Sequence, residues 1–148
     1  MDMHSQHGSK GIRPVPLLEG LTVLLGRAFF GFIFLMAGPL HFTHQEIAYA
    51  ASVGLPLASF LVPLSGIIAL MGALSIILGF HAKFGAWMIV IFLIPVTLMM
   101  HKFWSIADPM AAKMQMIMFM KNLSMLGASL LITHFGAGPL SLDARRSK

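Results

Sequence analysis

Residues 113–122 read KMQMIMFMKN, in which methionine stands at alternate positions until a lysine follows. Strict alternation over a few residues is typical of a half-buried strand in a water-soluble protein. The composition excludes that interpretation, because 57% of the 148 residues are hydrophobic and only 10% are charged. Such a chain suits a lipid bilayer, where a lone strand would leave its backbone polar groups unpaired. We therefore predict that this stretch is part of a membrane helix.

Four apolar stretches are each long enough to cross about 30 Å of hydrocarbon, which takes about 20 helical residues. They cover residues 17–38, 57–80, 84–103 and 115–136. The expected fold class is an all-α membrane protein, with a four-helix transmembrane bundle over residues 17–136. A short amphipathic helix is expected at the membrane interface in the loop after the first span, over residues 44–53. Residues 1–16 and 137–148 are expected to be polar and basic cytoplasmic tails.

The basic residues are distributed unevenly between the two ends of these spans. One end carries most of the cations, namely Lys10, Arg13, Lys83, Arg145, Arg146 and Lys148. The other end carries Lys102 and Lys113, beside the interfacial anchor Trp104. The positive-inside rule then places both termini in the cytoplasm. We expect a multi-pass protein of the bacterial inner (cytoplasmic) membrane.

The absence of cysteine narrows the classes of function. It excludes disulfides, thiolate metal sites, iron–sulfur ligation and covalent haem attachment within this chain. No flavin motif is recognised, and His41 with His101 is a weak pair for a membrane haem, so haem, flavin and iron–sulfur cofactors are not expected. The net charge of +5 does not indicate a nucleic-acid partner, because the cations lie mainly beside the span ends.

Helical geometry separates the methionines of the opening stretch. Successive residues turn by about 100°, so alternate methionines fall on opposite sides of the helix. Met114 and Met118 share a face with Lys121, which we interpret as the polar, bundle-facing side. Two thioethers near His101 would suit Cu(I), but methionine also fills gaps in helix packing. We prefer the packing interpretation and predict no metal site.

Polar residues on three spans form the candidate site. Arg27 lies near the middle of the first span, on a glycine face that permits close helix approach. His101 ends the third span, and Lys121 and Asn122 lie within the fourth. A cation in the bilayer centre costs about 2.5–3.5 kcal/mol on insertion scales, and the spans contain no central carboxylate. We therefore expect a substrate anion, a quinone oxygen, a lipid headgroup or a partner's carboxylate to complete the site.

Several stretches resemble the DoxX family of small four-helix integral membrane proteins. They are LGR at 25–27, ASVGLP at 51–56, GALSIILGF at 72–80, HKFW at 101–104, ADPMAA at 107–112, MFMKNLSMLGASLLI at 118–132 and FGAGPLSLDARR at 135–146. The resemblance implies a membrane oxidoreductase, similar to the quinone-reducing membrane subunit of thiosulfate:quinone oxidoreductase. The polar positions of that family fall on Arg27, His101, Lys121 and Asn122. A glutamate common in its second helix is missing here, where Ala69 or a neighbour stands.

The preferred hypothesis is a quinone-linked oxidoreductase subunit with His101 and Lys121 as catalytic residues. Lys121, Arg27 and Asn122 would bind the quinone, and His101 would transfer protons near neutral pH. Electrons would come from the substrate or from a soluble or membrane redox partner. Two alternatives are a non-catalytic scaffold or partner-binding subunit of a redox complex, and a small anion transporter, which would require a homo-oligomer.

Overall fold

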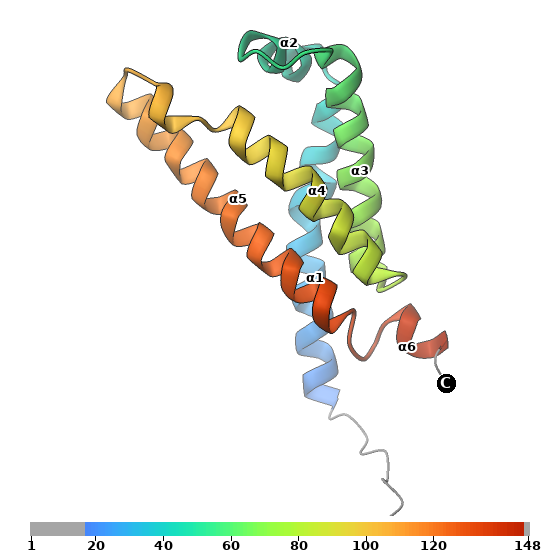
Figure 1. Cartoon of the computed structure of the whole chain (residues 1–148). Helices are drawn as coiled ribbons and strands as arrows, with labels where there is room; N and C mark the ends of the chain where they lie inside the picture. The colour runs from blue at the N-terminus through green and yellow to red at the C-terminus, as the bar shows by residue number, and fades with distance from the viewer. Residues whose placement is uncertain (1–16, 147–148) are drawn as a thin grey trace, which may run out of the picture.

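Figure 1 shows the computed structural model of the chain, in which residues 17–146 are described. Four long helices form the framework: α1 (Leu17–Ala37), α3 (Ala58–Leu78), α4 (Ala82–Met100) and α5 (Pro109–Phe135). The shorter elements are η1 (Gly38–Phe42), α2 (His44–Ser52), η2 (Phe103–Ser105) and α6 (Leu142–Arg146). Residues 17–146 contain no strand, and the four long helices are apolar enough to cross a membrane. The predicted fold class is therefore confirmed.

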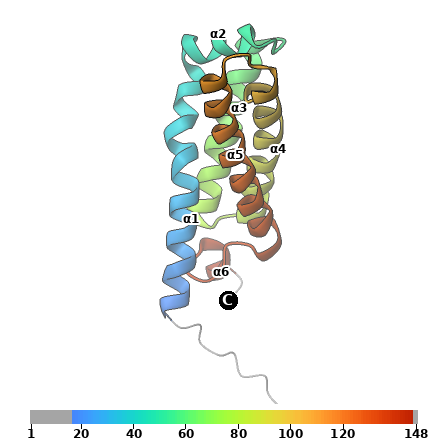
Figure 2. The same ribbon diagram turned by 90° about the vertical axis from the view of Figure 1, so that its left-hand side faces the viewer.

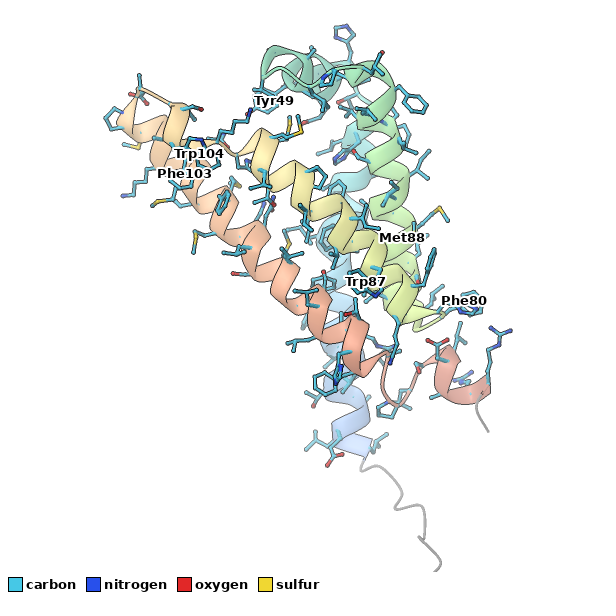
Figure 3. The ribbon with its side chains drawn as sticks, in the orientation of Figure 1. Tyr49, Phe80, Trp87, Met88, Phe103 and Trp104 are labelled. Atoms are coloured by element: carbon cyan, nitrogen blue, oxygen red, sulfur yellow. The ribbon has the colours of Figure 1, made fainter. Side chains whose placement is uncertain are left out.

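The cations expected in the N-terminal tail, Lys10 and Arg13, lie outside the described residues, as does Lys148. We call the end of the bundle that carries α2 the loop end and the opposite end, near α6, the terminal end (Figure 2). Figure 3 places Phe103 and Trp104 at the loop end and Phe80 at the terminal end.

The four spans pack in chain order. α1 packs on α3, α3 on α4 and α4 on α5, whereas no comparable packing joins α5 to α1 within the described residues. Figure 1 shows α5 leaning away from α3 toward the loop end. The bundle is therefore a curved row of helices that is more open at the loop end than at the terminal end.

Small side chains bring α3 and α4 together at the centre of this row. Ala73 and Ala86 are fully buried, and a Cβ atom on Gly72 would lie 2.9 Å from the carbonyl oxygen of Gly85. Helices in lipid gain little from burying apolar surface, so their association depends on such close packing. Most of the large apolar side chains instead lie on the outside, where they meet the hydrocarbon of the bilayer.

The opening stretch, residues 113–122, lies within α5. This helix begins at Pro109 rather than at Gln115, because the Asp108 carboxylate accepts a hydrogen bond of 2.7 Å from the Ala111 N–H group. An N-cap aspartate followed by proline in the first turn is a strong helix start. The Asp108–Pro109 turn expected before the fourth span is therefore its first turn.

The C-terminal residues differ from the tail that we expected. Gly136 and Gly138, with φ angles of 77° and 67°, turn the chain back toward the α3–α4 hairpin. Ala137 and Ser141 are buried, and the Asp143 N–H group donates to the Gly79 carbonyl oxygen at 2.8 Å. Residues 137–146 thus form a folded C-terminal segment that closes the terminal end.

Candidate functional site

A cavity of about 560 Å³ lies at the loop end of the bundle. Its lining is mostly apolar and includes Phe34, Ile68, Phe92, Val96 and Met125. Its polar lining comes from η1, α2, α3, the end of α4 and α5, and consists of His41, Glu46, Tyr49, Ser65, His101, Lys121 and Asn122. A largely apolar cavity with a few convergent polar groups is the usual form of a small-molecule site.

The α2 helix covers this cavity because its apolar face is seated on α3. Ala50 of α2 packs with Ala58 and Val62 of α3 in a small buried cluster. The threonine before the helix caps it, since the Thr43 hydroxyl accepts a hydrogen bond of 3.4 Å from the Glu46 N–H group. The helical spacing then places Glu46 on the cavity side, together with Ala50.

His101 is the C-cap residue of α4, and its side chain forms a hydrogen bond with a residue of α5. Its Nδ1 atom lies 2.7 Å from Oε1 of Gln115. Gln115 donates in turn to the Tyr49 hydroxyl at 3.5 Å, and that hydroxyl donates to the Met100 carbonyl oxygen at 3.4 Å. A chain of polar contacts therefore joins α2, α5 and the end of α4 at the mouth of the bundle.

Asn122 is the most deeply buried polar residue of the cavity, with 4% of its surface exposed. Its side-chain amide forms no hydrogen bond with the residues that the structure describes. Its amide atoms are not among the fully buried side-chain atoms without a hydrogen bond within residues 17–146, which are Nε and Nη1 of Arg27, so the amide retains surface that is accessible from the cavity. The amide is therefore placed to bond a polar atom of a ligand.

Lys121 precedes Asn122 and also lines the cavity, but its side chain is exposed, as is that of Met114, so the face that we interpreted as bundle-facing is only partly covered. Its Nζ atom contacts the Met118 sulfur at 3.5 Å, which is a weak acceptor. Glu46 lines the same cavity, although the two groups form no ion pair within residues 17–146. A count of charges in the four spans does not include this carboxylate, because Glu46 belongs to α2, the short helix between α1 and α3.

Arg27 lies elsewhere, although it is 3% exposed and points away from lipid as expected. Its Nη2 atom donates a hydrogen bond of 2.8 Å to the carbonyl oxygen of Leu140 in the C-terminal segment. Its Nη1 atom lies so close to Gly79 that a Cβ atom there would overlap it. Because α1 continues past the α3–α4 hairpin, the middle of α1 is level with the terminal end of its neighbours. The structure thus brings together His101, Lys121 and Asn122, but not Arg27.

Asp143 organises the terminal end. Its carboxylate accepts hydrogen bonds from the N–H groups of His81 at 2.8 Å and of Ala82 at 3.0 Å, and so caps the first turn of α4. Burial raises the pKa of this carboxyl, but the two hydrogen bonds and nearby positive charges lower it more, so that the pKa lies below its ordinary value. Asp143 also interacts electrostatically with Arg27. The C-terminal segment therefore supplies the counter-charge that the spans lack.

The sequence interpretation did not include Glu46, Tyr49 or Gln115 in the site, and it named His41 only as a weak haem-ligand pair with His101. The available signal was the pattern Thr43-x-x-Glu46, a capping-box sequence that marks the start of α2 and fixes which of its residues share a face. The structure forms one of its two bonds, since the Thr43 N–H group donates to the Leu40 carbonyl oxygen instead of to Glu46. No group of three or more His, Cys, Asp or Glu side chains within residues 17–146 is arranged to hold a metal ion.

Comparisons with known proteins identify the family. The model of the SURF4 family matches residues 28–148. The inner membrane protein YphA of Escherichia coli (strain K12) is 31% identical over 134 residues, which cover 90% of this chain and 91% of YphA. No solved structure matches significantly. The expected membership of the DoxX family is wrong, because the family model that matches is that of SURF4. This chain belongs to the SURF4 family and is an integral membrane protein.

Proposed function

We propose that the chain binds a quinone in the loop-end cavity and serves as a membrane subunit of a quinone-linked oxidoreductase. The buried Asn122 amide carries this proposal, because it offers hydrogen-bonding groups to the cavity and has no bond to the described residues. The apolar lining suits a ring and a hydrophobic tail, and the polar groups suit the ring oxygens. The name of the relative YphA supports a place in the inner membrane, and the distribution of cations supports cytoplasmic termini.

Lys121 and Asn122 act together in this proposal. Both side chains can donate hydrogen bonds to a quinone carbonyl oxygen, and the ammonium group of Lys121 stabilises negative charge that develops there on reduction. His101 moves the accompanying protons, since imidazole exchanges protons near neutral pH. A soluble or membrane redox partner supplies the electrons. Arg27 stands outside this arrangement, because it is bonded to the C-terminal segment.

Quinone binding to the protein in lipid nanodiscs tests the proposal. Duroquinone (tetramethyl-1,4-benzoquinone) should bind, and Lys121→Met should weaken its binding about 10- to 100-fold, the value of a charge-assisted hydrogen bond of about 1.5–3 kcal/mol. Lys113→Met is the matched control, because Lys113 lies on the same helix but does not line the cavity. Absence of duroquinone binding to the folded protein would contradict the proposal.

The exposure of α5 favours a second candidate, a non-catalytic subunit that binds a membrane partner. In the most apolar 18-residue stretch of α5, only 11% of the residues are buried, compared with 39% in the corresponding stretch of the span that contains α4. A partner helix seated on α5 would cover this surface. In that case Lys121→Met would reduce recovery of the partner in co-purification, and neither quinone binding nor a redox rate would change.

A further inference from the structure

Two histidines, His41 and His101, line the loop-end cavity, and each ring is bonded to a neighbouring oxygen atom through its own Nδ1 atom. Nδ1 of His41 lies 3.1 Å from the carbonyl oxygen of Ala37, and Nδ1 of His101 lies 2.7 Å from the amide oxygen of Gln115. Carbonyl and amide oxygens only accept hydrogen bonds, so each Nδ1 must carry a hydrogen. In each neutral ring, Nε2 is then an acceptor.

Packing fixes the position of the first ring. His41 contacts the edge of Phe92, with ring centroids 5.6 Å apart. The Cβ atom of His41 packs directly against Gly66, where a side chain would not fit, because a Cβ atom on residue 66 would lie 2.7 Å from the Cβ atom of His41. The ring therefore cannot easily turn to present its other nitrogen, and Gln115 restrains the ring of His101 in the same way.

These two acceptors decide which redox form of a ligand fits. An oxidised quinone offers only carbonyl oxygens, which cannot bond an acceptor nitrogen. The corresponding hydroquinone offers two hydroxyl groups that donate hydrogen bonds and still accept them. Lys121 and Asn122 can donate to either form, so they do not discriminate between the two.

We propose that the loop-end cavity prefers the dihydroxy, reduced form of its aromatic ligand, with His41 and His101 accepting hydrogen bonds from its hydroxyl groups. This inference rests on the proposed function and adds His41 to the binding residues.

The test compares durohydroquinone with duroquinone under anaerobic conditions, by calorimetric titration of the protein in nanodiscs at slightly alkaline pH. Durohydroquinone should bind at least about fivefold more tightly, the effect of one net hydrogen bond. His41→Leu and His101→Leu should each weaken durohydroquinone binding about fivefold and change duroquinone binding by less than about twofold. His134→Leu is the control, because His134 lies on α5 away from the cavity lining.

His41→Gln covers the case in which leucine disturbs folding, because its amide oxygen is again an acceptor and should recover most of the preference. Equal binding of the two forms, or an equal loss of both in the histidine variants, would overturn this inference and leave the proposed function standing. Binding of neither form would overturn both.

Discussion

The two ends of this bundle hold buried polar groups in different settings. At the terminal end, Asp143 accepts two backbone hydrogen bonds and Arg27 donates to Leu140 through Nη2, although Nε and Nη1 of Arg27 have no hydrogen-bond partner among residues 17–146. At the loop end, Asn122 and Lys121 face a cavity of about 560 Å³, and the Asn122 amide has no partner among residues 17–146. The comparison teaches that a buried cation in a membrane helix is not by itself a sign of a binding site. Its partners decide whether it stabilises the fold or is available to a ligand.

The largest expected effect is that of Gly79→Ala at the terminal end. The new Cβ atom would overlap Nη1 of Arg27 and Cβ of Ser141, and Gly79 has a φ angle of +64°. Overpacking and the strained backbone together should reduce the free energy of unfolding by about 3 kcal/mol. Thermal unfolding and limited proteolysis of the C-terminal segment measure this loss.

The control for that variant is Gly26→Ala, since a Cβ atom on Gly26 meets nothing within 4 Å. It should leave the unfolding temperature unchanged or raise it slightly. An intact C-terminal segment in Gly79→Ala would contradict the role that we assign to this junction.

Asp143→Asn should produce the next largest effect. The amide caps α4 less well than the carboxylate and removes the electrostatic interaction with Arg27, so we expect a loss of about 1–2 kcal/mol. The wild-type protein should show the same loss with pH. Because folding lowers the pKa of Asp143, its contribution is complete above the ordinary carboxyl pKa of about 4 and is lost as the pH falls through the lower, folded-state value.

Proteolysis of the C-terminal segment as a function of pH measures this contribution, and Asp143→Asn should remove that part of the acid sensitivity. Glu19→Gln is the control, because Glu19 is an exposed carboxylate on α1. A variant that released its C-terminal segment at the same acidic pH as the wild type would contradict the assignment.

Asn122→Leu tests the loop end. Removing the amide should weaken duroquinone binding about fivefold, because one neutral hydrogen bond is lost, and should not destabilise the unliganded protein, because the amide forms no hydrogen bond with the described residues. Titration and thermal unfolding of the same samples measure the two effects. Ser124→Leu, an exposed position on the same helix, is the control. Loss of both binding and stability would mean that Asn122 is a structural residue like Arg27.

Tyr49→Phe should have the smallest effect. The hydroxyl contacts of Tyr49 are long, at 3.4 and 3.5 Å, so their loss should cost about 0.5 kcal/mol. Faster amide hydrogen exchange in α2, without a change in the long helices, is the expected result. Unchanged exchange would show that the packing of Ala50 against α3 is sufficient to hold α2 in place.

Much of the fold follows from composition. The density of apolar residues predicts four membrane helices, and the glycine and proline after residue 53 correctly limit α2. The first turn of α5 was missed because an apolar stretch shows where a helix is hydrophobic, whereas the Asp108 cap decides where it begins. The family was also missed, since the similarity of short glycine-rich stretches does not separate one family of small membrane bundles from another.

The sequence by itself determined that this chain is a membrane protein with four spans and that several cations lie within or beside them. It also determined that Lys121 and Asn122 share a helix with four alternating methionines. The expected packing role of these methionines was wrong for three of them, because Met114, Met116 and Met120 are 53%, 43% and 53% exposed. Only the tertiary structure decided which carboxylate lies in the neighbourhood of each cation. Arg27 is near Asp143, and Glu46 shares the cavity of Lys121, although neither carboxylate belongs to a span. The reason is physical: periodicity fixes the face of each helix, but the offset between helices and the folding of the segments that join them depend on contacts distant in the sequence.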